Sequence, residues 1–165
     1  MKKIVALSLV IIISAIAFTG CVQAPPPKSD PIKISEMKSE YGLTKMCKDL
    51  LKKEYLPESG EKMSADVIGA EIGYRFQAKV NNDAISIELY EFDTEKLNET
   101  AKTTIKDIEK NGHFNVLNYK DVPAKLSDNK EYVVIYSDEK ATGDKADKAH
   151  EKQYKAFMKI FNSAE

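Results

Sequence analysis

The sequence predicts an α+β domain in which helices pack on a mostly antiparallel sheet of about four strands, with the elements in the order α-β-β-α-β-β-α. Three observations lead to this fold class. Two neighbouring segments, 70–80 and 85–89, alternate between apolar and polar residues, as strands with one buried face do. Three other segments carry apolar residues at the spacing of amphipathic helices. The segment 132–137 is apolar without alternation, which favours a central strand covered on both faces.

The first helix is expected from about residue 35 to residue 55. Its apolar stripe follows the helical spacing i, i+3, i+4, i+7 and i+8, and consists of Leu43, Met46, Cys47, Leu50 and Leu51. Gly42 lies near the middle of this segment and weakens its first half, because glycine is a poor helix former. The segment 56–63 contains Pro57 and Gly60 and is predicted to be a loop.

The two alternating segments predict a β-hairpin. If Asn82 and Asp83 form a two-residue turn, the apolar residues of both strands share one face. The same register places residues on the other face opposite one another, Arg75 opposite Tyr90 and Gly73 opposite Phe92.

The second half of the chain predicts a helix, two strands and a final helix. The helix is expected to begin at Asp93 or Thr94, to bury a stripe from Leu97 to Ile108, and to end at Asn111–Gly112. A short strand with Phe114 and Val116 follows, with Tyr119 as its furthest extension, then a loop over 120–130 and the central strand 132–137. The last helix carries one inner stripe, which consists of His150, Tyr154, Phe157, Met158 and Phe161.

The N-terminal segment has the layout of a secretory signal peptide. Lys2 and Lys3 precede an apolar run over 4–18, which is shorter than the roughly 20 residues of a membrane-spanning helix. The following Phe18-Thr19-Gly20-Cys21 resembles the lipobox of prokaryotic lipoproteins, with Phe18 in place of the usual leucine. This resemblance implies cleavage before Cys21, lipidation of its thiol, and attachment to the cell membrane on the extracytoplasmic side. An ordinary cleaved signal and an uncleaved anchor are the alternatives.

These features divide the chain into three parts. Residues 1–20 are the expected signal peptide, and residues 21–34 are the lipid-anchor cysteine with a proline-rich tether. Prolines favour an extended chain of about 3.1 Å per residue, so ten tether residues span up to roughly 30 Å. Residues 35–165 form the expected single globular domain, which resembles small prokaryotic lipoproteins in size and layout.

The composition and the known motifs exclude several functions. The chain carries 25 basic and 26 acidic residues without a concentrated basic stretch, so no nucleic-acid partner is expected. The sequence has no HExxH, CxxC, calcium-loop, GxSxG or phosphate-loop motif, so no metal and no cofactor are expected.

The few residues with catalytic potential have structural explanations. Cys47 lies on an apolar helix stripe and is expected to be a core residue. His113 follows a helix end, and His150 lies on the inner side of the last helix, where a satisfied, partly buried histidine is expected. Glu91 follows the alternation onto the inner face beside Tyr74, so its carboxylate must be paired or at the edge of the sheet. An enzyme is therefore not favoured, although the sequence does not decide the question.

We expect a lipid-anchored binding or interaction module. Its partners would be the membrane through lipidated Cys21 and either an envelope protein or a small ligand. Arg75, Tyr90 and Phe92 cluster on the nominally polar face of the hairpin and are the predicted binding residues, because arginine and aromatic residues are enriched in binding hot spots. The alternatives are a cross-strand Arg75–Tyr90 pair or a helix over this face. An accessory lipoprotein of envelope assembly or transport is the second candidate function, and a hydrolase of envelope material is the third.

Overall fold

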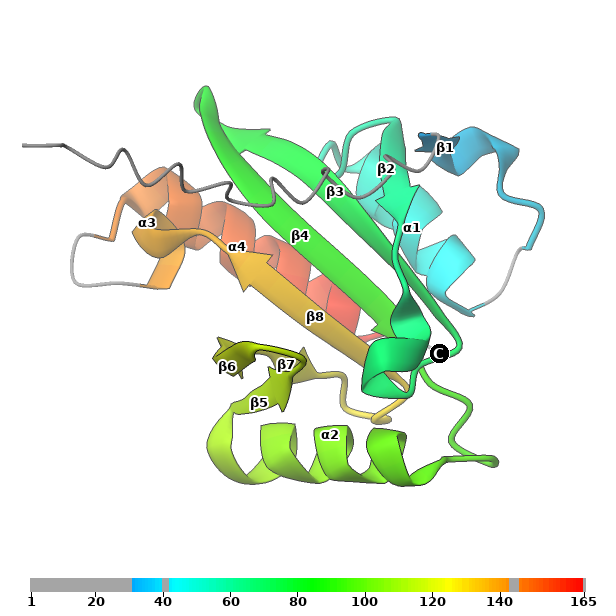
Figure 1. Cartoon of the computed structure of the whole chain (residues 1–165). Helices are drawn as coiled ribbons and strands as arrows, with labels where there is room; N and C mark the ends of the chain where they lie inside the picture. The colour runs from blue at the N-terminus through cyan, green and yellow to red at the C-terminus, as the bar shows by residue number, and fades with distance from the viewer. Residues whose placement is uncertain (1–30, 40–41, 143–145, 165) are drawn as a thin grey trace, which may run out of the picture.

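A computed structural model describes residues 31–39, 42–142 and 146–164. Within them, six strands form one antiparallel sheet in the spatial order β1-β2-β3-β4-β8-β7 (Figure 1). The strands, in this order, are Ile32–Lys33, Ser59–Lys62, Ile72–Val80, Asp83–Glu91, Tyr132–Ser137 and Lys125–Leu126. The strands β5 (His113–Val116) and β6 (Tyr119–Pro123) pair in a separate two-stranded sheet. The predicted α+β class and antiparallel sheet are confirmed, whereas the prediction of about four strands is wrong.

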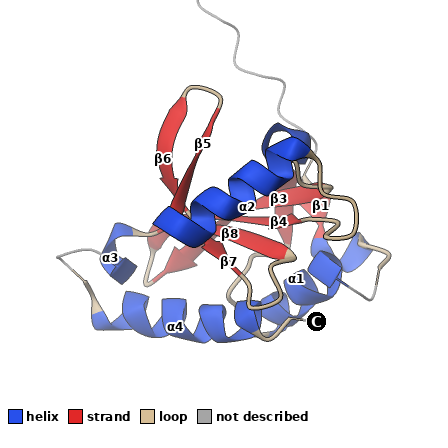
Figure 2. Ribbon diagram, turned by 90° about the horizontal axis from the view of Figure 1, so that it is seen from below, coloured by secondary structure: helices blue, strands red, loops and turns tan. Residues whose placement is uncertain are grey.

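Helices cover both faces of the sheet. The described residues form α1 (Gly42–Lys52), α2 (Glu99–Asn111), the short α3 (Glu139–Thr142) and α4 (Lys148–Asn162), together with the single turns η1 (Ile34–Glu36) and η2 (Ala65–Ile68). Figure 2 shows α2 on one side of the sheet and α1 with α4 on the other. Each face therefore has its own apolar core, one built with α1 and α4 and the other with α2.

The first helix is shorter than the sequence predicts. It begins at Gly42, whose φ of 60° lies in the left-handed region, and not near residue 35. A Cβ atom at this position would lie 2.5 Å from Oε1 of Glu91, so glycine is needed where the helix starts against the sheet. Gly42, which lies near the middle of the predicted helix, is thus the first residue of the observed helix α1.

The predicted hairpin forms, but its turn is shifted by one residue. Asn81 and Asn82 are the two turn residues, with φ of 50° and 82°, and Val80 pairs with Asp83. Asparagine tolerates the left-handed conformation that a two-residue hairpin turn requires, and two adjacent asparagines satisfy it better than Asn82–Asp83. Each cross-strand partner shifts by two positions, which keeps every side chain on the predicted face.

The second helix ends as predicted at Gly112, which has a φ of 73°. It begins at Glu99 instead of at Asp93 or Thr94, because the Asn98 side chain accepts a hydrogen bond of 2.8 Å from the Ala101 amide and caps the helix there. The central position of β8 between β4 and β7 is confirmed, and so is the inner stripe of α4, in which His150, Phe157 and Phe161 are buried.

The predicted loops contain strands that the sequence pattern does not reveal. β2 lies within the predicted loop 56–63, and β7 lies within the predicted loop 120–130. β6 begins at Tyr119, which was assigned to the preceding strand, and continues into the same loop, so that the predicted strand is instead a hairpin of β5 and β6. β2 and β6 are mostly exposed and β7 has only two residues, so none shows the alternation that marks a half-buried strand. The edge strand β1 likewise brings Ile32 and Lys33, assigned to the tether, into the sheet.

Candidate functional site

The predicted binding residues lie on the face of the sheet that α2 covers. Tyr90 is 4% exposed and Phe92 is 2% exposed, and both belong to the apolar core that includes Ala101 and Ile105 of α2. The Arg75 side chain alone remains 38% exposed. The expectation that this face presents all three side chains to a partner is therefore wrong, because the apolar stripe of α2 needs the same aromatic surface for its own burial.

Arg75 and Tyr90 meet through a shared carboxylate and do not stack directly. Arg75 is opposite Glu88 in the register and donates from Nε to its Oε1 over 2.9 Å. The Tyr90 hydroxyl donates to the other oxygen of Glu88 over 2.6 Å. Burial and the bond to Glu88 raise the pKa of Tyr90 well above its usual value. The Tyr90 ring lies over Gly73, where a Cβ atom would clash with Cδ1 of the ring. This arrangement is structural.

A second polar group surrounds His150 at the end of the sheet where β3 turns into β4. The imidazole is 2% exposed, with Nδ1 2.9 Å from Oδ2 of Asp138 and Nε2 3.2 Å from Oδ2 of Asp83. Lys140 also pairs with Asp83, and its hydrogen bond is the largest cause that lowers the pKa of this carboxyl group. The expectation of a satisfied histidine is confirmed, and His150 is fully buried.

This group joins α4 to the sheet and has no arrangement for nucleophilic catalysis. A histidine base needs one ring nitrogen beside the hydroxyl or thiol that it activates. Here both nitrogens of His150 face carboxylates, and the adjoining hollow of about 350 Å³ is lined by the same groups and by Ser137. The geometry fits a buried polar connection between distant elements.

Cys47 and Glu91 lie on the α1 side of the sheet. Cys47 is fully buried, and burial together with nearby Glu91 raises the pKa of its thiol to about 12, so the prediction of a core residue is confirmed. Glu91 accepts a hydrogen bond of 3.1 Å from the Leu43 amide at the start of α1. Burial nevertheless raises the pKa of this carboxyl group. Glu91 therefore lies on the inner face, as predicted, and its carboxylate stabilises the N-terminal end of α1.

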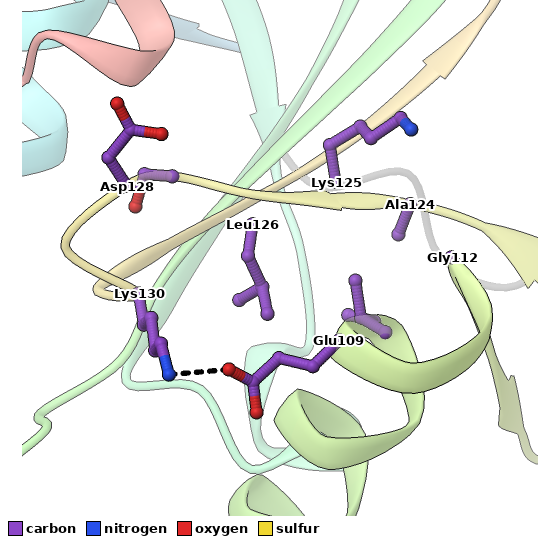
Figure 3. Close-up of a pocket in the computed structure, with 9 residues that line it drawn as sticks. Glu109, Gly112, Ala124, Lys125, Leu126, Asp128 and Lys130 are labelled. Carbon is purple, nitrogen blue, oxygen red and sulfur yellow. Dashed lines mark ion pairs between the residues drawn. The ribbon is translucent and has the colours of Figure 1, made fainter.

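Two hollows flank the strand β7. The first, of about 340 Å³, lies between the C-terminal end of α2 and the segment 124–130 (Figure 3). Leu126 points into it, and an ion pair of 2.5 Å between Lys130 and Glu109 spans it. Asp128 points away from the hollow. The charged side chains that line this hollow are therefore either paired with each other or point away from it.

The second hollow, of about 270 Å³, lies on the other side of β7. Its aromatic lining comes from Tyr136 and Tyr154, whose rings meet edge to face at 5.0 Å. Lys125 lines both hollows and points to the opposite side of its strand from Leu126 (Figure 3). The Tyr136 hydroxyl is buried and finds no hydrogen-bond partner among the described residues, although buried polar groups are nearly always paired. This hollow combines aromatic surface with a cation, and one of its two tyrosines carries a buried hydroxyl.

Sequence reasoning missed this combination. Tyr154 belongs to the predicted inner stripe and Tyr136 to the predicted central strand, so both were assigned to the core. Lys125 falls in a segment predicted to be a loop. The available signal for this site was the presence of two tyrosines at positions assigned to the core, because a buried tyrosine carries a hydroxyl that needs a hydrogen-bond partner.

In the described part of the chain, no group of three or more histidine, cysteine, aspartate or glutamate residues is arranged to hold a metal ion. None of the helices described is long and apolar enough to cross a membrane. Comparison with protein-family models found no match, and searches of curated proteins and of solved structures found no significant similarity.

Proposed function

We propose that this protein is a lipid-anchored extracytoplasmic binding module. The observation that carries the proposal is the position of Cys21 in Phe18-Thr19-Gly20-Cys21, directly after an apolar run and before a proline-rich segment. Residues 1–30 lie outside the described residues, so this part of the proposal rests on the sequence. Two or more acyl chains on one cysteine anchor a protein stably, whereas one chain holds it marginally.

The hollow lined by Tyr136, Tyr154 and Lys125 is the proposed ligand site. A ligand with an apolar or aromatic part would pack on the two rings, and an acidic group would pair with Lys125. A pocket of apolar surface with a few placed polar groups is the usual form of a small-molecule site.

The anchoring is tested by metabolic labelling with a lipid precursor. Wild-type protein should carry the label, and the variant Cys21→Ser should lose it while its domain folds normally. Label retained by the serine variant would contradict the proposal.

The ligand site is tested by native mass spectrometry of the protein purified from its own membrane. We expect a bound small molecule whose occupancy falls in Tyr154→Ala, which removes one of the two rings, and in Lys125→Ala. Lys79→Ala, which changes an exposed lysine near the C-terminal end of β3, two strands away from β8 in the sheet, is the matched control and should retain the molecule. A copurifying protein in place of a small molecule would favour the accessory role in envelope assembly or transport.

A further inference from the structure

The hairpin formed by β5 and β6 projects from the domain with an apolar tip. Figure 2 shows both strands extending beyond the other elements, on the side away from α4. The tip residues Leu117 and Tyr119 are 80% and 70% exposed, and with Val67 they are the large apolar residues that the described chain leaves exposed. Exposed apolar residues are ordinary when scattered singly, but here two lie together at the end of a projection.

The tip is held in a defined and costly conformation. Leu117 has a φ of 51°, in a two-residue turn between Val116 and Tyr119, a position where glycine or asparagine is normally found. Below the turn, the Asn115 side chain accepts a hydrogen bond of 2.9 Å from the Asp121 amide at an irregularity in the pairing. An exposed leucine kept in a strained turn is more consistent with a role for its side chain than with a role in folding.

We propose that this tip enters the surface of the lipid bilayer to which Cys21 is attached. This inference rests on the proposed lipid anchor. Leucine and tyrosine suit the boundary between headgroups and acyl chains, where tyrosine places its ring in an apolar layer and its hydroxyl in water.

The size of the apolar patch distinguishes a bilayer from a protein partner. Two such side chains can bury on the order of 300 Å² of surface area, whereas a stable protein interface buries about 800 Å² on each partner. A bilayer needs no complementary shape. Beside the tip, Lys120 is exposed and complements anionic headgroups, whereas the carboxylate of the adjoining Asp121 lies against His113.

The tether keeps the bilayer within reach of the tip. Residues 22–31 separate Cys21 from the first strand and span up to roughly 30 Å when extended. A domain of this size has a radius of gyration of about 14 Å, so the tether is comparable with the width of the fold. A projecting hairpin can therefore contact the bilayer while the lipid remains inserted, and this second contact would fix how the domain faces the membrane.

The test uses a tryptophan reporter, since the sequence contains no tryptophan. Tyr119→Trp exchanges one aromatic residue for another at a position with ordinary φ, and Val67→Trp is a matched exposed control on η2. Each full-length lipidated variant is reconstituted into vesicles of phosphatidylethanolamine and phosphatidylglycerol, with or without bromine on the acyl chains. We expect the emission of the Tyr119→Trp variant to shift to shorter wavelength and to be quenched by brominated lipid. The emission of the Val67→Trp variant should stay unchanged.

The outcomes separate this inference from the lipid anchor. A Tyr119→Trp protein that floats with the vesicles while its tryptophan emits as in water would overturn the tip contact and leave the anchor standing. The tip contact is also overturned if the reporter is shielded in native membranes but not in pure lipid, because a protein partner would then cover the tip. A protein that fails to float would overturn the anchor, and with it the tip contact that depends on its reach.

A second substitution tests the role of the leucine. Leu117→Asn relieves the strained turn, because asparagine tolerates a positive φ, but removes half of the apolar tip. Combined with Tyr119→Trp, it should reduce quenching of the reporter by brominated lipid without lowering stability. Unchanged quenching would mean that Leu117 does not enter the bilayer.

Discussion

The Tyr90 hydroxyl and the Glu88 carboxylate form a hydrogen bond of 2.6 Å on the face of the sheet that α2 covers. Arg75 holds the other oxygen of the same carboxylate, so a side chain at the molecular surface is linked to one in the core. Arg75 and Tyr90 therefore lie on the same face of the sheet but have different structural roles. Tyr90 supplies buried ring area, whereas Arg75 neutralises the charge that Glu88 brings to the edge of the core.

Truncation at Tyr90 should therefore affect folding. Tyr90→Phe removes only the bond to Glu88 and should cost about 1 kcal/mol of unfolding free energy. Tyr90→Ala also leaves a cavity beneath α2 and should cost about 4 kcal/mol. Denaturant titration of both variants measures the two values. Similar small losses would mean that the ring is not part of the core.

Replacement of His150 should weaken the connection between α4 and the sheet. His150→Gln removes the imidazole from the buried carboxylate of Asp138, which then keeps only the Lys140 amide as a donor among the described residues, and should cost about 3 kcal/mol. The matched variant Asp83→Asn alters the half-exposed partner of the same imidazole and should cost clearly less. Thermal unfolding compares the two, and equal losses would contradict the separate roles given to the two aspartates.

The thiol of Cys47 should be unreactive until the domain unfolds. Burial raises its pKa to about 12, so almost no thiolate exists near neutral pH, and the side chain is closed to reagents. In a Cys21→Ser chain, where Cys47 is the remaining thiol, a thiol reagent should label slowly in buffer and rapidly in denaturant. Cys47→Ala should cost about 1 kcal/mol. Fast labelling of the native protein would reopen a reactive role for this cysteine.

Ionisation of Glu91 should oppose folding. Its pKa is higher in the folded than in the unfolded protein, so the associated stability is present while the carboxyl is protonated and is lost as the pH rises through the folded pKa. Glu91→Gln can still accept the bond from the Leu43 amide. The variant should therefore gain stability relative to wild type as the pH is raised from about 4, near the usual pKa of glutamate, to neutrality.

Urea unfolding at acid and neutral pH measures this difference. Glu61→Gln, which alters an exposed glutamate in β2, controls for a general change in net charge. A relative gain that appears only on the acid side would mean that the folded pKa is lowered and that the hydrogen bond at the start of α1 dominates over burial.

Elements with strong periodicity were predictable from the sequence, and exposed elements were not. The hairpin of β3 and β4 and the apolar stripe of α4 were expected because each buries a regular pattern of side chains, and the central β8 was expected because its segment is apolar throughout. The strands β2, β6 and β7 were missed because short or exposed strands carry no such pattern. The start of α1 was misplaced because Glu91, 49 residues after Gly42, determines where that helix can begin.

The sequence by itself determined the apolar faces of the main helices and strands, the burial of Cys47, the inner position of His150, and the lipobox-like segment on which the anchoring proposal rests. Only the tertiary structure decided that α2 covers Tyr90 and Phe92, that Asp83 and Asp138 meet at His150, and that Leu117 and Tyr119 stand free at a projecting tip. The physical reason is the range of the interactions involved. Periodicity records which side of an element must leave water, because that depends on neighbours three or four residues away. It does not record which distant element will cover that side, and that choice decides which polar groups meet and which surface remains available for binding.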